Sequence, residues 1–218
     1  KRSNKISDII NKNIYVTEKL FYKASKLKKI KVIFASANSV ISSKSQKRID
    51  MSTPFSVQEF YSSSKLIGES LLLEYLGRER SSIIRLPAIY GTNNKEGLIH
   101  RLITLSKKNQ DIHIDDPKCL FNNAITLSCV VDFLEKIIID IDKINGNDFL
   151  IAADEEISLI SMAKKIINRM NSKSKIVTRN SVMSEEMNYL IDTSLAKQFG
   201  FKPEKMINIV DMVCASYE

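Results

Sequence analysis

Glycine is scarce in this chain. Only six glycines occur among its 218 residues, at positions 68, 77, 91, 97, 146 and 200, and no two of them lie close enough to form a glycine-rich turn. Such a turn lets the backbone approach the phosphates of a dinucleotide. These 218 residues therefore contain no phosphate cradle of that kind.

The chain also has few cysteines and no long apolar run. The three cysteines are Cys119, Cys129 and Cys214. An odd number of cysteines without CxxC spacing, and without a histidine cluster nearby, argues against a disulfide framework and against a metal site. Charged residues interrupt the longest apolar candidate, residues 130–141, so we expect no membrane span. The N-terminal residues do not resemble a signal peptide, and we predict a cytoplasmic protein.

The positive charge does not point to a nucleic-acid partner. The net charge is +8, but the lysines are scattered, with short clusters only at residues 26–31 and 44–48. No finger, basic-zipper or RNA-recognition signature accompanies them. We therefore expect solvated helix faces or attraction for an anionic substrate such as a nucleotide diphosphate.

Apolar periodicity in the first part of the chain predicts alternating helices and strands. The predicted elements are a helix at 6–27, a strand at 31–35, a loop at 42–54, a helix at 56–76 that Gly77 ends, and a strand at 82–86. This alternation predicts an α/β fold with a doubly wound parallel sheet. We assign it to residues 1–91.

Beyond Gly91 the pattern predicts a smaller mixed α/β lobe, residues 92–218, with some segments returning to the first domain. Its predicted elements are helices at 98–108, 130–141 and 159–170, strands at 112–114, 149–152 and 175–178, then a short helix, a turn at 200–203 and a closing helix.

Tyr61 and Lys65 are the clearest candidates for chemistry. They are four residues apart in a predicted helix, which places the phenol and the ammonium on one face, about one turn apart. A nearby cation favours the phenolate, and an ordinary tyrosine titrates near pH ~10. The pair can therefore serve as an acid and base, provided that a hydride acceptor is supplied.

Five segments, in order, carry a resemblance to a known family. The chain resembles the extended short-chain dehydrogenases, the nucleotide-sugar epimerase and dehydratase family, in residues 13–17, 34–36, 61–65, 85–91 and 192–203. YxxxK alone is a weak pattern, but the order of the others supports it. The resemblance implies that the family's glycine-rich loop lies before Lys1, so that residues 1–91 hold the C-terminal half of a Rossmann-type sheet. It also implies that residues 92–218 form the substrate-binding lobe.

The resemblance also implies a mechanism and a cofactor, NAD or NADP. Tyr61 would shuttle the proton of a sugar hydroxyl, and Lys65 would hold the ribose of the cofactor. Further cofactor contacts are expected at Ala35, Leu86, Pro87 and Ile89.

The third member of the family's catalytic triad is replaced. Alignment on Val40 puts Ala37 where relatives have serine or threonine. Either Ser39, on the same face of an extended strand, or Ser36 compensates, or the activity is weak, or the chain is degenerate. Losing such a donor costs on the order of 100-fold in rate. Asn38 and Ser39 also occupy the places of the dehydratases' Asp-Glu pair, which disfavours dehydration and leaves a 4-epimerase or a keto-sugar reductase, for example in polysaccharide biosynthesis.

Substrate contacts are expected along the segments that follow. The candidates, besides Ser39, are Ala88, Asn93, Asn94, Leu98 and Arg101, of which Arg101 suits a diphosphate. Asn122 or Asn123 stands where relatives place a phosphate-binding arginine, and His100 and His113 are expected in packing or surface roles.

The resemblance further implies a homodimer through the helices at 6–27 and 56–76. The alternative is a catalytically silent relative that binds a sugar nucleotide or acts as an oligomerisation module. Ala37 and the absent glycine loop keep that alternative open.

Overall fold

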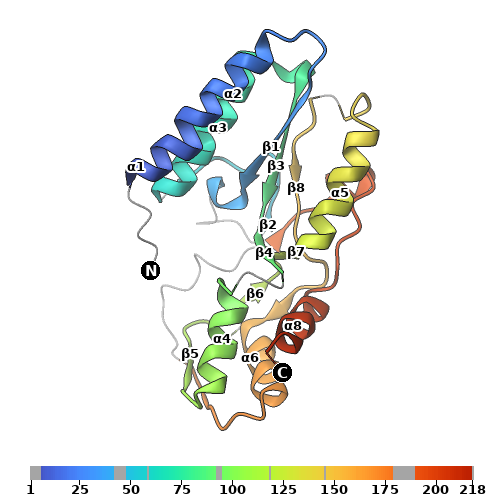
Figure 1. Ribbon diagram of the computed structural model, residues 1–218. Coiled ribbons are helices and arrows are strands. Elements are labelled where there is room, and N and C mark those ends of the chain that lie inside the picture. The colour runs from blue at the N-terminus through green and yellow to red at the C-terminus, as the bar shows by residue number, and fades with distance from the viewer. Residues whose placement is uncertain are drawn as a thin grey trace.

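The computed structural model describes residues 6–41, 48–57, 59–91, 95–117, 119–144, 146–178 and 190–217. A parallel sheet with the strand order β1-β3-β8 forms its centre, from β1 (Val32–Ala37), β3 (Ser81–Leu86) and β8 (Phe149–Leu150). Helices cover both faces of the sheet (Figure 1). The predicted α/β class is confirmed.

One face of the sheet is covered by two helical stretches that lie side by side and run in the same direction, because Asn13 contacts Ser64 near their starts and Tyr22 contacts Tyr75 near their ends. The first runs through α1 (Ile6–Ile9), the π-helical η1 (Ile10–Tyr15) and α2 (Val16–Ser25), and the second is α3 (Phe60–Leu76). Their core with β3 contains Phe21, Leu72, Leu76 and Ile83. The predicted helix at 6–27 is therefore present, with a π-helical segment inside it.

The opposite face is covered by α5 (Leu127–Ile139) and the short α7 (Ser194–Gln198). The ring of Phe133 on α5 packs edge-on against Phe149 of β8, with centroids 5.5 Å apart. The ring of Phe201 also packs against Phe133, with centroids 5.1 Å apart. We call this three-layer part, with β1, β3, β8, α1 to α3, α5 and α7, the sheet lobe.

Glycines set the length and the depth of α3. The helix ends before Gly77, as the sequence predicted, and the φ of 66° at Gly77 is strained for other residues. Its start at Phe60 is four residues later than predicted, because Glu59 is extended. A Cβ on Gly68 would lie 2.5 Å from Cζ of Phe34, so glycine allows the close approach of α3 to β1.

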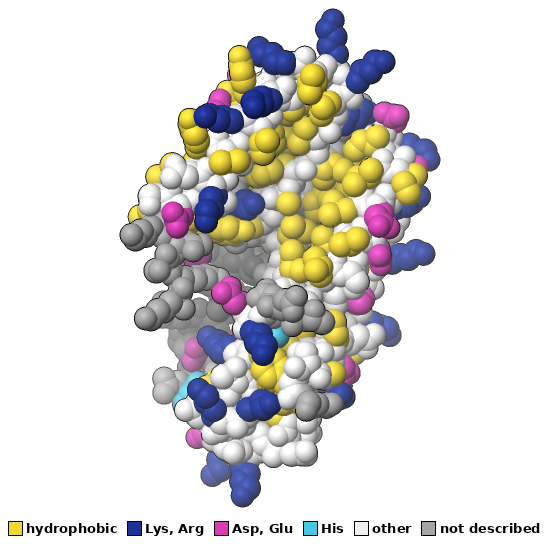
Figure 2. Space-filling model, viewed as in Figure 1, with side chains coloured by type: hydrophobic (Ala, Val, Ile, Leu, Met, Phe, Trp, Pro, Cys, Tyr) yellow, Lys and Arg dark blue, Asp and Glu magenta, His cyan; other side chains and the backbone are white. Residues whose placement is uncertain are grey.

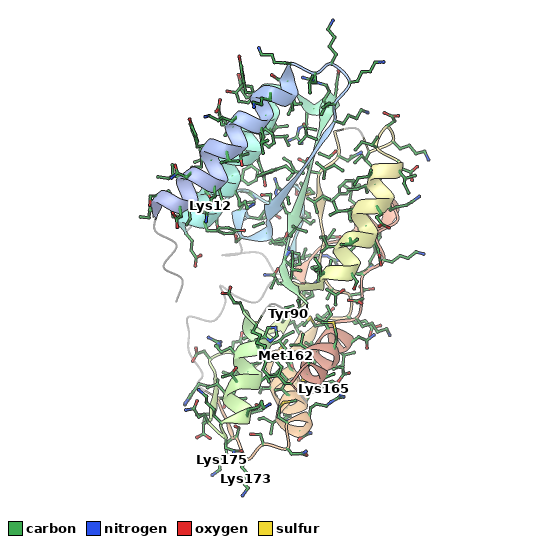
Figure 3. All side chains as sticks on the ribbon, in the orientation of Figure 1. Lys12, Tyr90, Met162, Lys165, Lys173 and Lys175 are labelled. Carbon is green, nitrogen blue, oxygen red and sulfur yellow. The ribbon has the colours of Figure 1, made fainter. Side chains whose placement is uncertain are left out.

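The second lobe is a helical layer with short strand pairs. It contains α4 (Leu98–Lys107), α6 (Leu159–Arg169), α8 (Met206–Ala215), the parallel pair β5 (Ile112–Ile114) and β10 (Ile176–Thr178), and the antiparallel pair β6 (Leu120–Phe121) and β9 (Ile157–Ser158). Its core includes Ile99, Ile103, Met162 and Val210. Figure 3 labels Met162 in the second lobe and Tyr90 near the junction of the lobes.

Short parallel pairs join the lobes. They are β4 (Ala88–Tyr90) with β7 (Ala124–Thr126), and β2 (Arg48–Ile49) with β11 (Leu190–Ile191). The 3-10 turn η2 (Asn38–Val40) follows β1, and the 3-10 turn η3 (Arg78–Arg80) precedes β3. Because β8 lies in the first sheet, a segment beyond residue 91 contributes to the sheet lobe, and the boundary at 91 stays a prediction.

Neither a membrane span nor a metal cluster is found within the described ranges. No helix there has the length and apolarity needed to cross a bilayer. No group of three or more His, Cys, Asp or Glu side chains there is arranged to hold a metal ion.

Candidate active site

The candidate site lies at the carboxyl ends of β1 and β3. The two strands are parallel and Ala37 pairs with Leu86, so both end at the same edge of the sheet. Ligands of open α/β sheets bind at this edge. The structure therefore brings together the end of β1, the segment after β3 and the first turns of α3.

Lys65 reaches across from α3 to the end of β1. Its Nζ donates a hydrogen bond to the carbonyl oxygen of Ala35 at 3.0 Å. The ammonium also lies 5.3 Å from the ring centroid of Phe34 and 5.9 Å from that of Tyr61. Burial lowers the pKa of Lys65 below its ordinary value. The Tyr61 side chain is 44% exposed, so a substrate has access to the phenol.

Ser39 is positioned differently from its predicted place on an extended strand. The strand ends at Ala37, and Ser39 lies in the 3-10 turn η2. There its Oγ accepts a hydrogen bond from Oγ of Ser62 at 2.8 Å. Since Ser62 follows Tyr61 directly, this bond ties the Ser39 hydroxyl to the first turn of α3. Ser62 had no recognisable signal in the sequence.

The two neighbours of Ala37 point inward. Ser36 is buried, and its Oγ has no hydrogen-bond partner within the described ranges. Asn38 is buried as well, and its Nδ2 donates to the carbonyl oxygen of Ile151 at 3.3 Å and to Oδ1 of Asn123 at 3.5 Å. Asn38 thus links η2 to the chain after β8.

The segment after β3 is mostly apolar. Leu86, Pro87 and Ile89 are half-buried, and Ala88 is exposed. Pro87 lacks an N–H and separates β3 from β4. Leu86 and Ile89 pack against the core under α5. Their predicted contact with the cofactor stays a prediction.

The predicted substrate residues are spread over a wider region. Asn93 and Asn94 lie outside the described residues. Leu98 begins α4 and packs against the core of the second lobe, and Arg101 is exposed one turn later. Gly97, with a φ of 99°, lets the chain turn into α4 beside the Tyr90 hydroxyl. The role of Arg101 stays a prediction.

Asn122 is not available to a phosphate. Its Nδ2 donates to the carbonyl oxygens of Ala153 at 3.3 Å and Ile191 at 3.2 Å, and its Oδ1 accepts from the Ile191 N–H at 3.0 Å. Because the amide is buried and both its nitrogen and its oxygen are bonded to the backbone, Asn122 braces the fold and is a poor substitute for the relatives' arginine. Sequence alone did not reveal this backbone bracing.

Two further polar contacts lie beside the site and in the second lobe. Asn13, in the segment that carried the resemblance, donates through Nδ2 to Oγ of Ser64 at 3.0 Å, and Ser64 donates to the Tyr61 carbonyl at 2.6 Å. These bonds fix the first turn of α3. His100 is buried, with Nδ1 2.9 Å from the Tyr217 hydroxyl, which fits its expected packing role.

Comparison with known proteins places the chain in a family. A model of the family described as RmlD substrate binding domain matches residues 11–190. No protein with a curated description matches the sequence significantly. The family match and the solved structures confirm the resemblance to nucleotide-sugar epimerases and dehydratases.

Solved structures share the fold at low identity. The dTDP-glucose 4,6-dehydratase of Bacillus anthracis strain Ames, in complex with NAD, has a TM-score of 0.78 and 19% identity, over 98% of this chain and 70% of its own. The UDP-glucuronic acid 4-epimerase of Bacillus cereus, with UDP-glucuronic acid and NAD, gives 0.77 and 20% over 95% and 67%. The UDP-glucose 4-epimerase of Thermotoga maritima, with UDP-glucose, gives 0.75 and 17% over 97% and 70%.

Proposed function

The chain belongs to the RmlD substrate-binding domain family, and on that premise we propose that it forms part of an NAD(P)-dependent nucleotide-sugar epimerase or keto-sugar reductase. The main support is the Lys65 ammonium, held 3.0 Å from the Ala35 carbonyl oxygen on the helix face that also carries the accessible Tyr61. An acid/base pair at the ligand-binding edge of the sheet suits proton transfer to a sugar hydroxyl.

Tyr61 is the proposed proton shuttle. Its phenolate would accept the proton of a sugar hydroxyl and return it when the carbonyl is reduced, while Lys65 favours the ionised phenol. A bound nicotinamide would supply the hydride acceptor. The residues present fit the nicotinamide end of such a cofactor, because Lys65 can donate to ribose hydroxyls and Leu86, Pro87 and Ile89 offer a mostly apolar contact.

Ser39 is the proposed hydrogen-bond donor to the reacting oxygen. Because its Oγ accepts from Ser62, its own hydrogen can be directed at the substrate. The exposure of Ser39, in contrast to the buried Ser36, makes it the better donor. The Asn38 amide is hydrogen-bonded within the fold, and it is not an acidic group that could protonate a leaving hydroxyl. This supports epimerisation or reduction over dehydration.

Substitution of Tyr61 tests the function. In the full-length protein we expect Tyr61→Phe to reduce turnover of a nucleotide sugar by at least about 100-fold, because the proton shuttle is removed. Tyr22→Phe is the matched control, an exposed tyrosine on α2. Turnover is followed by product chromatography and by cofactor absorbance. Undiminished turnover in Tyr61→Phe would remove Tyr61 from the mechanism.

The second candidate function is that of a silent sugar-nucleotide-binding relative. The observation in its favour is Ala37, a buried residue that offers no hydroxyl at the position where relatives have one. Calorimetric titration with UDP-sugars and dTDP-sugars separates the two functions. Binding without turnover or cofactor reduction supports the silent relative, and turnover excludes it.

We also propose a homodimer through α2 and α3. Their outer faces carry exposed apolar side chains, including Leu20, Phe60 and Ile67. A second copy would bury them with a gain of about 25 cal/mol per Å² of apolar surface. Sedimentation velocity of the full-length protein with Leu20→Lys and Ile67→Lys tests this assembly, and an unchanged dimer would contradict it.

A further inference from the structure

A buried ion pair connects the helix of the candidate site to the central strand. Nε of Arg85 donates to Oε1 of Glu69 at 3.0 Å, and Nη2 donates to Oε2 at 2.8 Å. Both side chains are 4% exposed, and no other ion pair among the described residues has both members so buried. Two parallel bonds to a planar guanidinium fix direction as well as distance.

The pair connects the two halves of the site. Tyr61, Lys65 and Glu69 follow at intervals of four along α3, so they share one stripe of the helix. Arg85 directly precedes Leu86 on β3 and pairs in register with Ser36 on β1. The bidentate contact therefore fixes the rotation of α3 relative to the strand that leads into the expected cofactor segment.

Arg85 also contacts the segment behind Ser39. Its Nη1 lies 3.5 Å from Sδ of Met51, and its guanidinium carbon lies 5.0 Å from the ring centroid of Phe55. Phe55 forms a β-bridge with Ile41, and the next residue donates its N–H to the Val40 carbonyl at 3.1 Å. The Arg85 guanidinium thus contacts both α3 and the segment around Met51 and Phe55. That segment pairs with residues 40 and 41, directly after Ser39 in η2.

Stability alone accounts poorly for such a pair. Removing two charges from water is costly, and apolar replacements of similar volume are often neutral or stabilising. We propose that Glu69 and Arg85 are positioning residues, which hold the Lys65 ammonium and the Ser39 turn in register with the segment after β3. The catalytic benefit rests on the proposed function, whereas the effect on Lys65 does not.

The test compares an apolar replacement of the Glu69–Arg85 pair with a substitution in a second, less buried ion pair. In the full-length protein, Glu69→Leu with Arg85→Met replaces the buried charges by apolar side chains. Asp148→Asn is the control, because Asp148 pairs with Arg78 and accepts the Ile83 N–H at 3.0 Å, near the opposite end of β3. Thermal melting, steady-state kinetics and competitive acetylation of Lys65 between pH 7 and 11 are measured for each.

We expect the double variant to melt near the parent while kcat falls about 100-fold, the loss that a misplacement of about 1 Å can produce. The midpoint pH for acetylation of Lys65 should rise, because burial lowers its pKa and displacement would restore solvent. Asp148→Asn should lower the melting temperature and leave that midpoint unchanged. A double variant with parental kcat and midpoint would overturn the proposal.

Failure of the proposed function is distinguishable from failure of this inference. Acetylation of Lys65 needs neither cofactor nor substrate. If the full-length protein converts no nucleotide sugar and the midpoint still rises in the double variant, the function fails and the positioning of Lys65 stands. If turnover is present and the midpoint does not move, the positioning pair is refuted and the function stands.

Discussion

The two lobes differ in how many of their large hydrophobic side chains remain exposed. Among the large hydrophobic side chains that are exposed in the described residues, Met212 alone belongs to the second lobe. The others belong to the sheet lobe, to the loop between α2 and β1, or to the segment between β2 and α3, and Leu127, Val131 and Ile138 form one stripe along α5. Figure 2 shows hydrophobic side chains gathered on the upper part of the molecule and few on the lower part.

The difference follows from how the strands and helices are partnered. In the second lobe, α4, α6 and α8 surround a common core. In the sheet lobe, β3 is buried along most of its length, but β1 pairs only with β3 among the described strands and is half-buried or exposed over residues 32–35. An unpaired edge beside apolar helix faces favours association. We therefore expect the second lobe to bury its hydrophobic core without a partner. The sheet lobe is expected to associate with another protein surface that covers its exposed apolar side chains.

The largest effect is expected in the core of the second lobe. Ile103→Ala removes a fully buried side chain from α4, so we expect the free energy of unfolding to fall by about 3 kcal/mol. Ile139→Ala, at a side chain that is 79% exposed, should change it by less than about 0.5 kcal/mol. Urea denaturation measures both, and equal losses would contradict the comparison.

The next effect tests the packing inside the sheet lobe. Gly68→Ala places a Cβ 2.5 Å from Cζ of Phe34, which forces α3 and β1 apart. We expect a loss of about 1–3 kcal/mol in the free energy of unfolding. Gly91→Ala is the control, because its Cβ would meet Leu127 at an ordinary 3.6 Å. Phe34→Leu in the Gly68→Ala background should restore part of the loss, and no recovery would argue against the clash.

The third effect tests the open surface of the sheet lobe. For the isolated 218 residues we expect marginal stability or self-association, visible as concentration-dependent sedimentation and melting. Val131→Lys with Ile138→Lys should weaken association by roughly tenfold or more, because apolar contacts are replaced by charges. Met212→Lys, on the second lobe, should have little effect. A sharp monomeric melt that is independent of concentration would contradict the expectation.

Regular elements were predictable where apolar periodicity is strong. The strand at 112–114 and the helices near 98–108 and 159–170 agree with β5, α4 and α6 to within about one residue. The pairs β4 with β7 and β2 with β11 were missed, because strands of two or three residues carry no measurable period.

The candidate site divides in the same way. Spacing alone placed Tyr61 and Lys65 on one face of α3, whose helix is confirmed. Neither the 3-10 turn at Ser39 nor its bond to Ser62 could be predicted, since both depend on how the end of β1 meets α3. The buried pair of Glu69 and Arg85 was missed for the same reason, because it joins residues 16 positions apart on two different elements.

The smallest effect compares local opening of the two lobes through their thiols. Burial raises the pKa of Cys119, beside β6 in the second lobe, and of Cys129 on α5 to about 11 in each case. With similar pKa values, only on the order of one thiol in a thousand is ionised at pH 8, so labelling depends on opening. Cys129 should then react several-fold faster with iodoacetamide, because its lobe exposes an unpaired strand edge. Because an opened thiol titrates near the ordinary value of about 8.5, rates for both should rise about tenfold per pH unit only below about pH 8, and peptide mass spectrometry resolves the two sites. The labelling rates of both thiols in denaturant serve as the reference for their intrinsic reactivity. Equal labelling rates in the native protein, after division by that reference, would show that the two lobes open together.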